Sequence, residues 1–378
     1  MGDFLHYRKI LSVFFVVAFV FAVFIPYGKT VNAISTSATS AILYCADNGE
    51  ILYEQNSHEK RAIASITKIM TAVIALEYAS ASDKEIKFTS DMTAIGSSMY
   101  LKEGEILTLT ELTKGMMMVS GNDAANAIAI GISGSTEEFA KLMNEKAKQI
   151  GMTDTSFVTP SGLDDENHYS TAYDMALLCT YAMDMQSFRE IVSQKSITVK
   201  YVYPENKTQI CTNHNKLLSL YEDCVGIKTG FTEKAGRTLT SAAERDGVRL
   251  IAVTLNDGND WNDHQELYNY GFSLVERVQL STKYSSIDVP VVGSENNTVK
   301  VSPYSQAEAT VMSSDIDKIE EKVYLPRFVY APLTKGSTVG KIEYILNDKV
   351  ISEINLVVSK DIEAKIREKH WYDFLTGK

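Results

Sequence analysis

The sequence has few of the residues that mark several common classes of protein. It has four cysteines in 378 residues, and no cysteine or histidine spacing is typical of a metal site. Acidic residues outnumber basic ones, and the formal net charge of −11 gives little attraction for nucleic-acid phosphates. Internal repeats and low-complexity tracts are also lacking. We therefore expect no metal, no other cofactor and no nucleic-acid partner.

The N-terminus has the layout of a secretory signal. Arg8 and Lys9 are followed by an uncharged apolar run over 11–25 and then by small residues. This pattern predicts a signal peptide over residues 1–33, cleaved after Ala33, and hence an exported, extracytoplasmic protein. An uncleaved anchor is the alternative, but the run is shorter than the roughly 20 residues that a membrane-spanning helix needs.

Export makes disulfides chemically accessible, and the even number of cysteines allows them. Cys211 and Cys224 are the nearest pair in the sequence. A domain of this size does not need such a bridge to be stable. We expect buried thiols, with a Cys211–Cys224 bridge as the alternative.

The first predicted domain, residues 34–280, combines strands and helices. Asn48-Gly49 between two apolar runs predicts a hairpin over 41–56. Apolar residues at helical spacing predict a buried helix that begins at Ser65. Other predicted helices cover 109–118, a stretch from 124, 136–150, 170–183 and 261–274, and predicted strands cover 196–201, 208–211, 225–230, 237–243 and 250–255. This order predicts an α+β fold in which helices flank an antiparallel sheet that includes the N-terminal strand.

The rest of the chain is predicted to form a β-rich domain and a short tail. Residues 285–358 show short strands only, with a turn-like link over 336–340, a pattern typical of a small β-sandwich. In the tail, residues 359–378, Trp371, Phe374 and Leu375 share one helical face, which could lie on a membrane surface. The apolar stripe does not extend upstream, so a tail without membrane contact is the alternative.

Three short motifs occur in an order that favours nucleophilic catalysis. Ser65 and Lys68 are three residues apart at the start of the buried helix, so their side chains project from one face. Ser120 and Asn122 lie at a predicted helix break, and Lys228-Thr229-Gly230 belongs to a predicted strand. A hydroxyl and an amine at the mouth of a buried helix cost stability, which suggests that this pair has a chemical role.

Together these motifs resemble those of the penicillin-recognising serine peptidases. The residues over 162–165 and 226–232 are similar to those of the low-molecular-weight D-alanyl-D-alanine carboxypeptidases, serine peptidase family S11. A second Ser-x-x-Lys, at 57–60, has no helical pattern around it and is predicted to be a coincidence. The resemblance implies a β-lactamase/transpeptidase-like fold for 34–280. It also implies removal of D-alanine from peptidoglycan stem peptides, covalent inhibition by β-lactam antibiotics, and membrane association of the tail.

The resemblance also implies a role for each motif residue in acyl transfer. Ser65 would be the nucleophile and Lys68 its base, once burial and the charge of Lys228 have lowered the pKa of the Lys68 amine. Ser120 would pass the proton to the leaving amine. The substrate would be held by Asn122, Lys228, Thr229 and Gly230, and its oxyanion by the backbone N–H groups of Ser65 and Phe231. The sequence does not identify the arginine that relatives use for the substrate carboxylate.

Other functions remain open at this level. A class A β-lactamase would need a Glu with Asn four residues later, and Glu166 lacks that partner. An endopeptidase that cuts peptidoglycan cross-links would use the same machinery, so the sequence does not exclude it. A non-catalytic wall-binding protein would not need the three motifs intact. His168 and His214 are predicted to be structural rather than catalytic.

Overall fold

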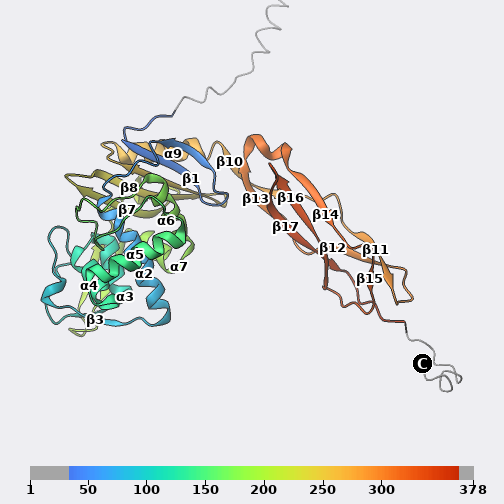
Figure 1. Cartoon of the computed structure of the whole chain (residues 1–378), viewed down its shortest axis with the longest axis horizontal. Helices are drawn as coiled ribbons and strands as arrows, with labels where there is room; N and C mark the ends of the chain where they lie inside the picture. The colour runs from blue at the N-terminus through green and yellow to red at the C-terminus, as the bar shows by residue number, and fades with distance from the viewer. Residues whose placement is uncertain (1–33, 366–378) are drawn as a thin grey trace, which may run out of the picture. The chain divides into compact units, whose positions relative to one another are not determined.

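The computed structural model describes residues 34–365 of the chain (Figure 1). The predicted signal peptide and the part of the predicted tail from 366 to 378 lie outside the described residues. Within 34–365, the helices are too short or too polar to cross a membrane. Both N-terminal cleavage and membrane contact by the tail stay predictions.

A five-stranded antiparallel sheet forms the centre of the first domain. Its strand order is β2-β1-β9-β8-β7. The strands are β1 (Ser40–Cys45), β2 (Ile51–Gln55), β7 (Cys224–Thr232), β8 (Gly236–Arg245) and β9 (Val248–Leu255). Strand β1 pairs with β9, which confirms that the N-terminal strand joins strands from much later in the sequence. Asp246 and Gly247 turn the chain between β8 and β9 with φ of 49° and 78°, as a two-residue hairpin turn requires.

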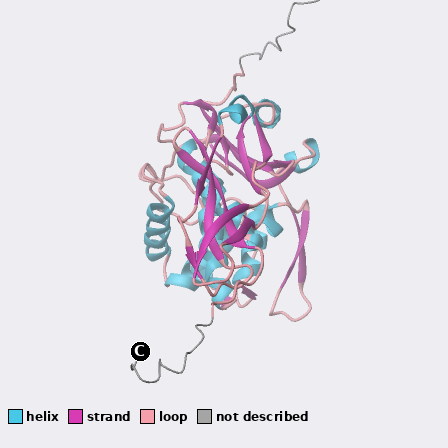
Figure 2. Ribbon diagram, turned by 90° about the vertical axis from the view of Figure 1, so that its right-hand side faces the viewer, coloured by secondary structure: helices cyan, strands magenta, loops and turns pink. Residues whose placement is uncertain are grey.

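Helices cover both faces of this sheet, and the mixture of helices and strands is visible in Figure 2. The helices are α2 (Lys68–Ala81), α3 (Leu109–Val119), α4 (Asn122–Ser133), α5 (Thr136–Ile150), α6 (Ala172–Asp184), α7 (Gln186–Val192), α8 (Leu217–Leu220) and α9 (Asp260–Gly271). Successive side chains of a strand point to opposite faces. Ile42 accordingly joins the core cluster that contains α2 and α6, whereas Leu43 lies against Gly271 of α9.

The predicted buried helix is present, but it begins later than expected. Residues Ala64–Thr67 form a short 3₁₀ helix, and α2 starts at Lys68. Ser65 therefore lies on the 3₁₀ turn, while Lys68 opens the α-helix that follows. Ile69 and Val73 of α2 are fully buried, which confirms that this helix lies inside the domain.

Several predicted boundaries are corrected. Helix α6 is capped by Thr171, whose side chain accepts a hydrogen bond from the backbone of Asp174, and not by Ser170. Helix α4 begins at Asn122 and not at residue 124. Strands β5 (Ser196–Lys200) and β6 (Thr208–Thr212) form a separate two-stranded sheet, as do β3 (Glu85–Lys87) and β4 (Ile106–Thr108).

The C-terminal domain is all-β among the described residues, apart from a 3₁₀ turn over Ser313–Lys318. One sheet has the order β14-β16-β17-β12-β11-β15, and β10 pairs with β13. The strands are β10 (Val275–Leu280), β11 (Ile287–Val292), β12 (Thr298–Pro303), β13 (Ala307–Met312), β14 (Glu320–Tyr324), β15 (Val329–Tyr330), β16 (Thr338–Leu346) and β17 (Lys349–Val358). Val301, Ile342 and Leu356 belong to its own hydrophobic core. The predicted turn-like link over 336–340 is wrong in part, because β16 already begins at Thr338.

All four cysteines are free and buried. The expectation of buried thiols is confirmed, and the alternative of a Cys211–Cys224 bridge is wrong for this structure. The core is large enough to stand without a disulfide.

Candidate active site

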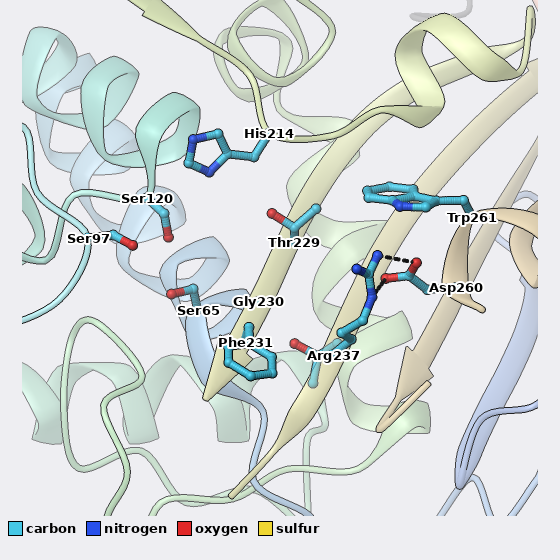
Figure 3. A pocket seen from close by; sticks show the side chains of 11 residues that line it. Ser65, Ser97, Ser120, His214, Thr229, Gly230, Phe231, Arg237, Asp260 and Trp261 are labelled. Carbon is cyan, nitrogen blue, oxygen red and sulfur yellow. Dashed lines mark hydrogen bonds and ion pairs between the residues drawn. The ribbon is translucent and has the colours of Figure 1, made fainter. Parts of the chain in front are cut away.

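A cleft of about 430 Å³ lies where the three motifs meet (Figure 3). Residues from each motif line it, although they are far apart in the sequence. Its lining residues are Ser65, Ser97, Ser120, His214, Thr229, Gly230, Phe231, Arg237, Thr238, Asp260 and Trp261. The fold thus brings the three sequence motifs together at one cleft.

Lys68 lies fully buried directly beside Ser65. Its Nζ is 3.0 Å from the Ser65 Oγ, 2.7 Å from the Asn122 Oδ1 and 2.7 Å from the backbone oxygen of Ser161. Two of these partners are carbonyl oxygens, which can only accept. A neutral amine has two N–H donors and one lone pair. It can therefore donate to both carbonyl oxygens and accept the proton of the Ser65 hydroxyl.

The surroundings of Lys68 favour this neutral form. Burial is the main reason that the pKa of its amine lies well below the ordinary value, and the positive charge of Lys228 lowers it further. The carboxylate of Asp123 acts in the opposite direction. The Asp123 carboxylate accepts hydrogen bonds from the backbone N–H groups of Met99 and Leu101, and it therefore holds the loop that contains them in place.

Ser120 and Asn122 lie at the junction of α3 and α4. Ser120 has φ of 61°, a left-handed conformation that ends α3 abruptly. Its hydroxyl and that of Ser65 both face the cleft (Figure 3). Asn122 accepts from Lys68 through Oδ1, and its Nδ2 donates to the backbone oxygen of Ile95 at 2.7 Å. One N–H of this amide and one lone pair remain for a ligand.

Strand β7 is an edge strand of the five-stranded sheet, and it contains Lys228, Thr229 and Gly230. Lys228 is buried, and burial lowers the pKa of its amine to about 7. A Cβ at position 230 would lie 2.4 Å from the Thr238 Oγ1 and 2.9 Å from the backbone nitrogen of Ser65. Only glycine lets the strand approach the Ser65 turn this closely.

Phe231 lies at the rim of the cleft with 65% of its surface exposed. Its partner in the β7–β8 ladder is Arg237, a residue that belongs to none of the three sequence motifs. The Arg237 guanidinium donates to Asp260 through Nε at 3.0 Å and Nη2 at 2.5 Å. It also lies 5.5 Å from the centroid of the Trp261 ring. Arg237 begins the strand predicted over 237–243, and the β7–β8 pairing seen in the structure is what places it beside the motif strand.

The two histidines differ in their positions. His168 is buried, its Nδ1 accepts from the backbone of Val158 at 3.0 Å, and its Nε2 pairs with the Thr67 hydroxyl at 2.8 Å. Burial lowers the pKa of its imidazole to about 4, as suits a neutral structural residue. His214 instead lines the cleft, and its predicted structural role stays a prediction.

The α+β fold and the cleft formed by the three motifs are those of the penicillin-recognising serine peptidases. The family model for D-alanyl-D-alanine carboxypeptidases matches residues 27–259. A second family model, for the C-terminal domain of penicillin-binding protein 5, matches residues 276–364. The chain therefore belongs to the D-alanyl-D-alanine carboxypeptidase family, and it is a serine-type carboxypeptidase, a hydrolase.

Individual relatives agree with this assignment over most of the chain. D-alanyl-D-alanine carboxypeptidase DacF of Bacillus subtilis (strain 168) is 32% identical over 351 residues, which are 89% of this chain and 88% of the relative. DacC of Escherichia coli (strain K12) is 33% identical over 356 residues, 89% of this chain and 86% of the relative.

Solved structures support the same fold. Penicillin-binding protein 5 of Haemophilus influenzae is similar with a TM-score of 0.65 and 28% identity, covering 88% of this chain and 99% of that one. A peptidoglycan synthesis regulatory factor (PBP3) of Streptococcus pneumoniae gives a TM-score of 0.73, covering 87% and 100%; at 23% identity it supports the fold alone. The predicted β-lactamase/transpeptidase-like fold is confirmed.

Proposed function

We propose that the protein removes the terminal D-alanine from peptidoglycan stem peptides through an acyl-enzyme on Ser65. The observation that carries this proposal is the buried amine of Lys68, 3.0 Å from the Ser65 hydroxyl. A serine hydroxyl is a weak nucleophile unless a base within hydrogen-bond reach accepts its proton. Lys68, neutral through burial, is that base.

Acylation begins when the Ser65 Oγ attacks the carbonyl carbon of the penultimate D-alanine and its proton passes to the Lys68 Nζ. The carbonyl oxygen becomes an oxyanion, which the backbone N–H groups of Ser65 and Phe231 stabilise. One such donor contributes about 2.7–4 kcal/mol to the transition state. The proton then moves through the Ser120 hydroxyl to the leaving nitrogen, and the peptide bond breaks. D-Alanine leaves as an amine, and the stem stays esterified to Ser65.

Hydrolysis of this ester completes the cycle. A water molecule gives its proton to Lys68 as its oxygen attacks the ester carbonyl. The same two backbone N–H groups stabilise the second oxyanion. When the ester bond breaks, the Ser65 oxygen recovers the proton from Lys68, and the shortened stem leaves with a free carboxylate.

Substrate binding uses the cationic end of the cleft and the open edge of β7. Lys228 and Thr229 suit the terminal carboxylate of the stem, and Arg237 on the next strand adds a planar donor group. Asn122 binds the peptide amide through its remaining donor and acceptor. The substrate backbone lies alongside β7, where Gly230 leaves room for it.

The same chemistry explains binding of penicillin. A β-lactam presents a strained amide carbonyl to Ser65 and a carboxylate to the cationic end of the cleft. Attack opens the ring and leaves an acyl-enzyme, so β-lactam antibiotics act as covalent inhibitors.

Release of D-alanine from a pentapeptide ending in D-Ala-D-Ala tests the proposal. The parent protein should release it, and Ser65→Ala should lose at least about a thousandfold in rate. Ser57→Ala is the matched control, because Ser57 begins the other Ser-x-x-Lys and its hydroxyl donates to Glu54 at 2.6 Å. Release by Ser65→Ala at the parent rate would show that Ser65 is not the nucleophile.

Two rival activities give different results in the same preparation. An endopeptidase would shorten cross-linked dimers in purified peptidoglycan, whereas the proposed activity leaves dimers intact and shortens only free pentapeptide ends. A β-lactamase would turn over a chromogenic cephalosporin rapidly rather than stay acylated. A non-catalytic wall-binding protein would cleave no peptide and would not react with the cephalosporin.

We also propose that the protein acts outside the cytoplasm, next to its peptidoglycan substrate. The support is the N-terminal pattern Arg8, Lys9 and apolar run before Ala33. N-terminal sequencing of the protein from its native cells should begin at Ile34. An intact N-terminus at Met1 would contradict export with cleavage.

A further inference from the structure

His214 is held at the cleft by the two asparagines that flank it. It follows β6 on a loop where the Asn213 Nδ2 donates to the backbone oxygens of Val192 at 3.2 Å and Gln194 at 3.1 Å. Asn215 is buried, and its Oδ1 accepts from the backbone of Leu217 at 3.0 Å. Both amide side chains are used to fix the loop. The imidazole between them is left facing the cleft, near Ser120 and Thr229 (Figure 3).

The ring nitrogens of His214 are free for a ligand. Among residues 34–365, neither nitrogen has a hydrogen-bond partner within the protein. His168 and His264 are the contrast, because both nitrogens of each ring are bonded: His264 pairs with Ser241 at 2.6 Å and with Thr254 at 3.0 Å. A histidine fixed in place with both nitrogens unused is suited to contact what enters the cleft.

The charges around His214 favour an anion as that ligand. Lys228 of β7 lies close enough to act on His214 through its charge, and Arg237 of β8 lines the cleft, whereas Lys68 of α2 is neutral. Among residues 34–365, the one carboxylate that lines the cleft is Asp260 of α9, and it is paired with Arg237. Burial and the charge of Lys228 lower the pKa of the His214 imidazole. These two effects favour the neutral form of the ring at neutral pH. A carboxylate bound between His214 and Lys228 would reverse that preference.

We propose that His214 is a substrate-binding residue that contacts the terminal carboxylate of the stem peptide and takes up a proton as the peptide binds. The proton comes from the solvent and stays on the imidazole while the carboxylate is bound. The inference rests on the proposed function, because it requires a substrate with a free carboxylate in this cleft. It predicts that binding is tighter at low pH than at high pH.

Calorimetry of peptide binding in buffers of different ionisation enthalpy measures this proton uptake directly. The protein is the full chain carrying Ser65→Ala, so that the peptide is not consumed, and the ligand is a tripeptide ending in D-Ala-D-Ala. At pH 6.5 we expect an uptake of about half a proton or more per peptide bound. With His214→Gln added, uptake should fall below about a quarter, the share left to Lys228 with its pKa of about 7.

Two controls separate the carboxylate contact from other effects. The same peptide with a C-terminal amide should bind without proton uptake. His58→Gln, which changes an exposed histidine that contacts Tyr173, should leave the uptake unchanged. In the His214→Gln protein, affinity for the free acid should be weaker by about threefold to tenfold at pH 6 and close to the parent value at pH 8.

The outcomes distinguish this inference from the proposed function. Equal proton uptake with and without His214→Gln, while the peptide still binds, would overturn the role of His214 and leave the proposed function intact. Equal uptake by the acid and the amide peptides would overturn the carboxylate contact. If the Ser65→Ala protein binds neither peptide at millimolar concentration, the assignment of the cleft as a D-Ala-D-Ala site fails, and the role of His214 fails with it.

Discussion

The amine of Lys68 and the hydroxyl of Ser65 lie 3.0 Å apart, and the lysine side chain has no exposure to solvent. A charged amine in that position would be costly, whereas a neutral one fits its two carbonyl partners. The stability of the folded chain thus favours the protonation state that the chemistry requires.

Replacing Lys68 with methionine should remove the base and keep most of the volume. We expect the variant to fold, as seen by circular dichroism, and to be acylated by penicillin about 10²–10⁴-fold more slowly. Lys234→Met is the control, since that lysine is exposed and donates to the backbone oxygen of Asp165. Acylation of folded Lys68→Met at the parent rate would show that another group activates Ser65.

Adding one methyl group at Gly230 should damage the active site more than the fold. The new Cβ would lie 2.4 Å from the Thr238 Oγ1 and 2.9 Å from the Ser65 nitrogen, so β7 or the Ser65 turn must move. We expect Gly230→Ala to lower the acylation rate by at least about tenfold, because small displacements of an oxyanion donor are costly. Gly258→Ala is the matched control, because a Cβ there meets nothing within 4 Å. Similar rates for both variants would contradict the close approach.

The pH dependence of substrate capture should report on Lys228. Its buried amine has a pKa of about 7, and only the protonated form attracts the terminal carboxylate. Catalytic efficiency at low substrate concentration should therefore fall as pH rises above about 7. In Lys228→Arg the charge persists, so this fall should move to higher pH. An alkaline limb that the substitution does not move would assign the titration to a different group.

Two buried histidines should make the fold sensitive to acid. Burial lowers the pKa of His264 to about 3 and that of His168 to about 4, from 6.5. The unfolded chain therefore binds protons that the folded chain does not, and stability is lost as pH falls from 6.5 toward 4. Each histidine contributes up to about 1.4 kcal/mol per pH unit to the free energy of unfolding.

Urea unfolding at several pH values measures this slope. His264→Gln should flatten it, because glutamine is not protonated and can still pair with Ser241 and Thr254. His58→Gln, at an exposed position, should not change it. An unchanged slope in His264→Gln would mean that acid acts elsewhere in the fold.

The sequence predicts features that depend on local pattern and misses those that depend on tertiary position. The hairpin at Asn48-Gly49 and the burial of α2 follow from turn chemistry and from the spacing of apolar residues. The start of the Ser65 helix is misplaced, because a 3₁₀ turn and an α-helix share the same pattern over one turn.

Within the cleft, too, some residues can be predicted from the sequence and others only from the tertiary structure. Ser65, Lys68 and the β7 motif are recognisable because short motifs carry them. Arg237 and Asp260 become visible only when the β7–β8 ladder and α9 bring them to the cleft. His214 carries no motif, and its place follows from loop contacts that the sequence does not indicate.

The most direct test of Ser65 as the nucleophile is the mass of the intact protein after brief exposure to benzylpenicillin. We expect the mass to increase by one penicillin molecule, with the adduct on the peptide that contains Ser65, and no increase in Ser65→Ala. A protein that gains no mass, or that carries the adduct at another residue, would contradict the proposed chemistry.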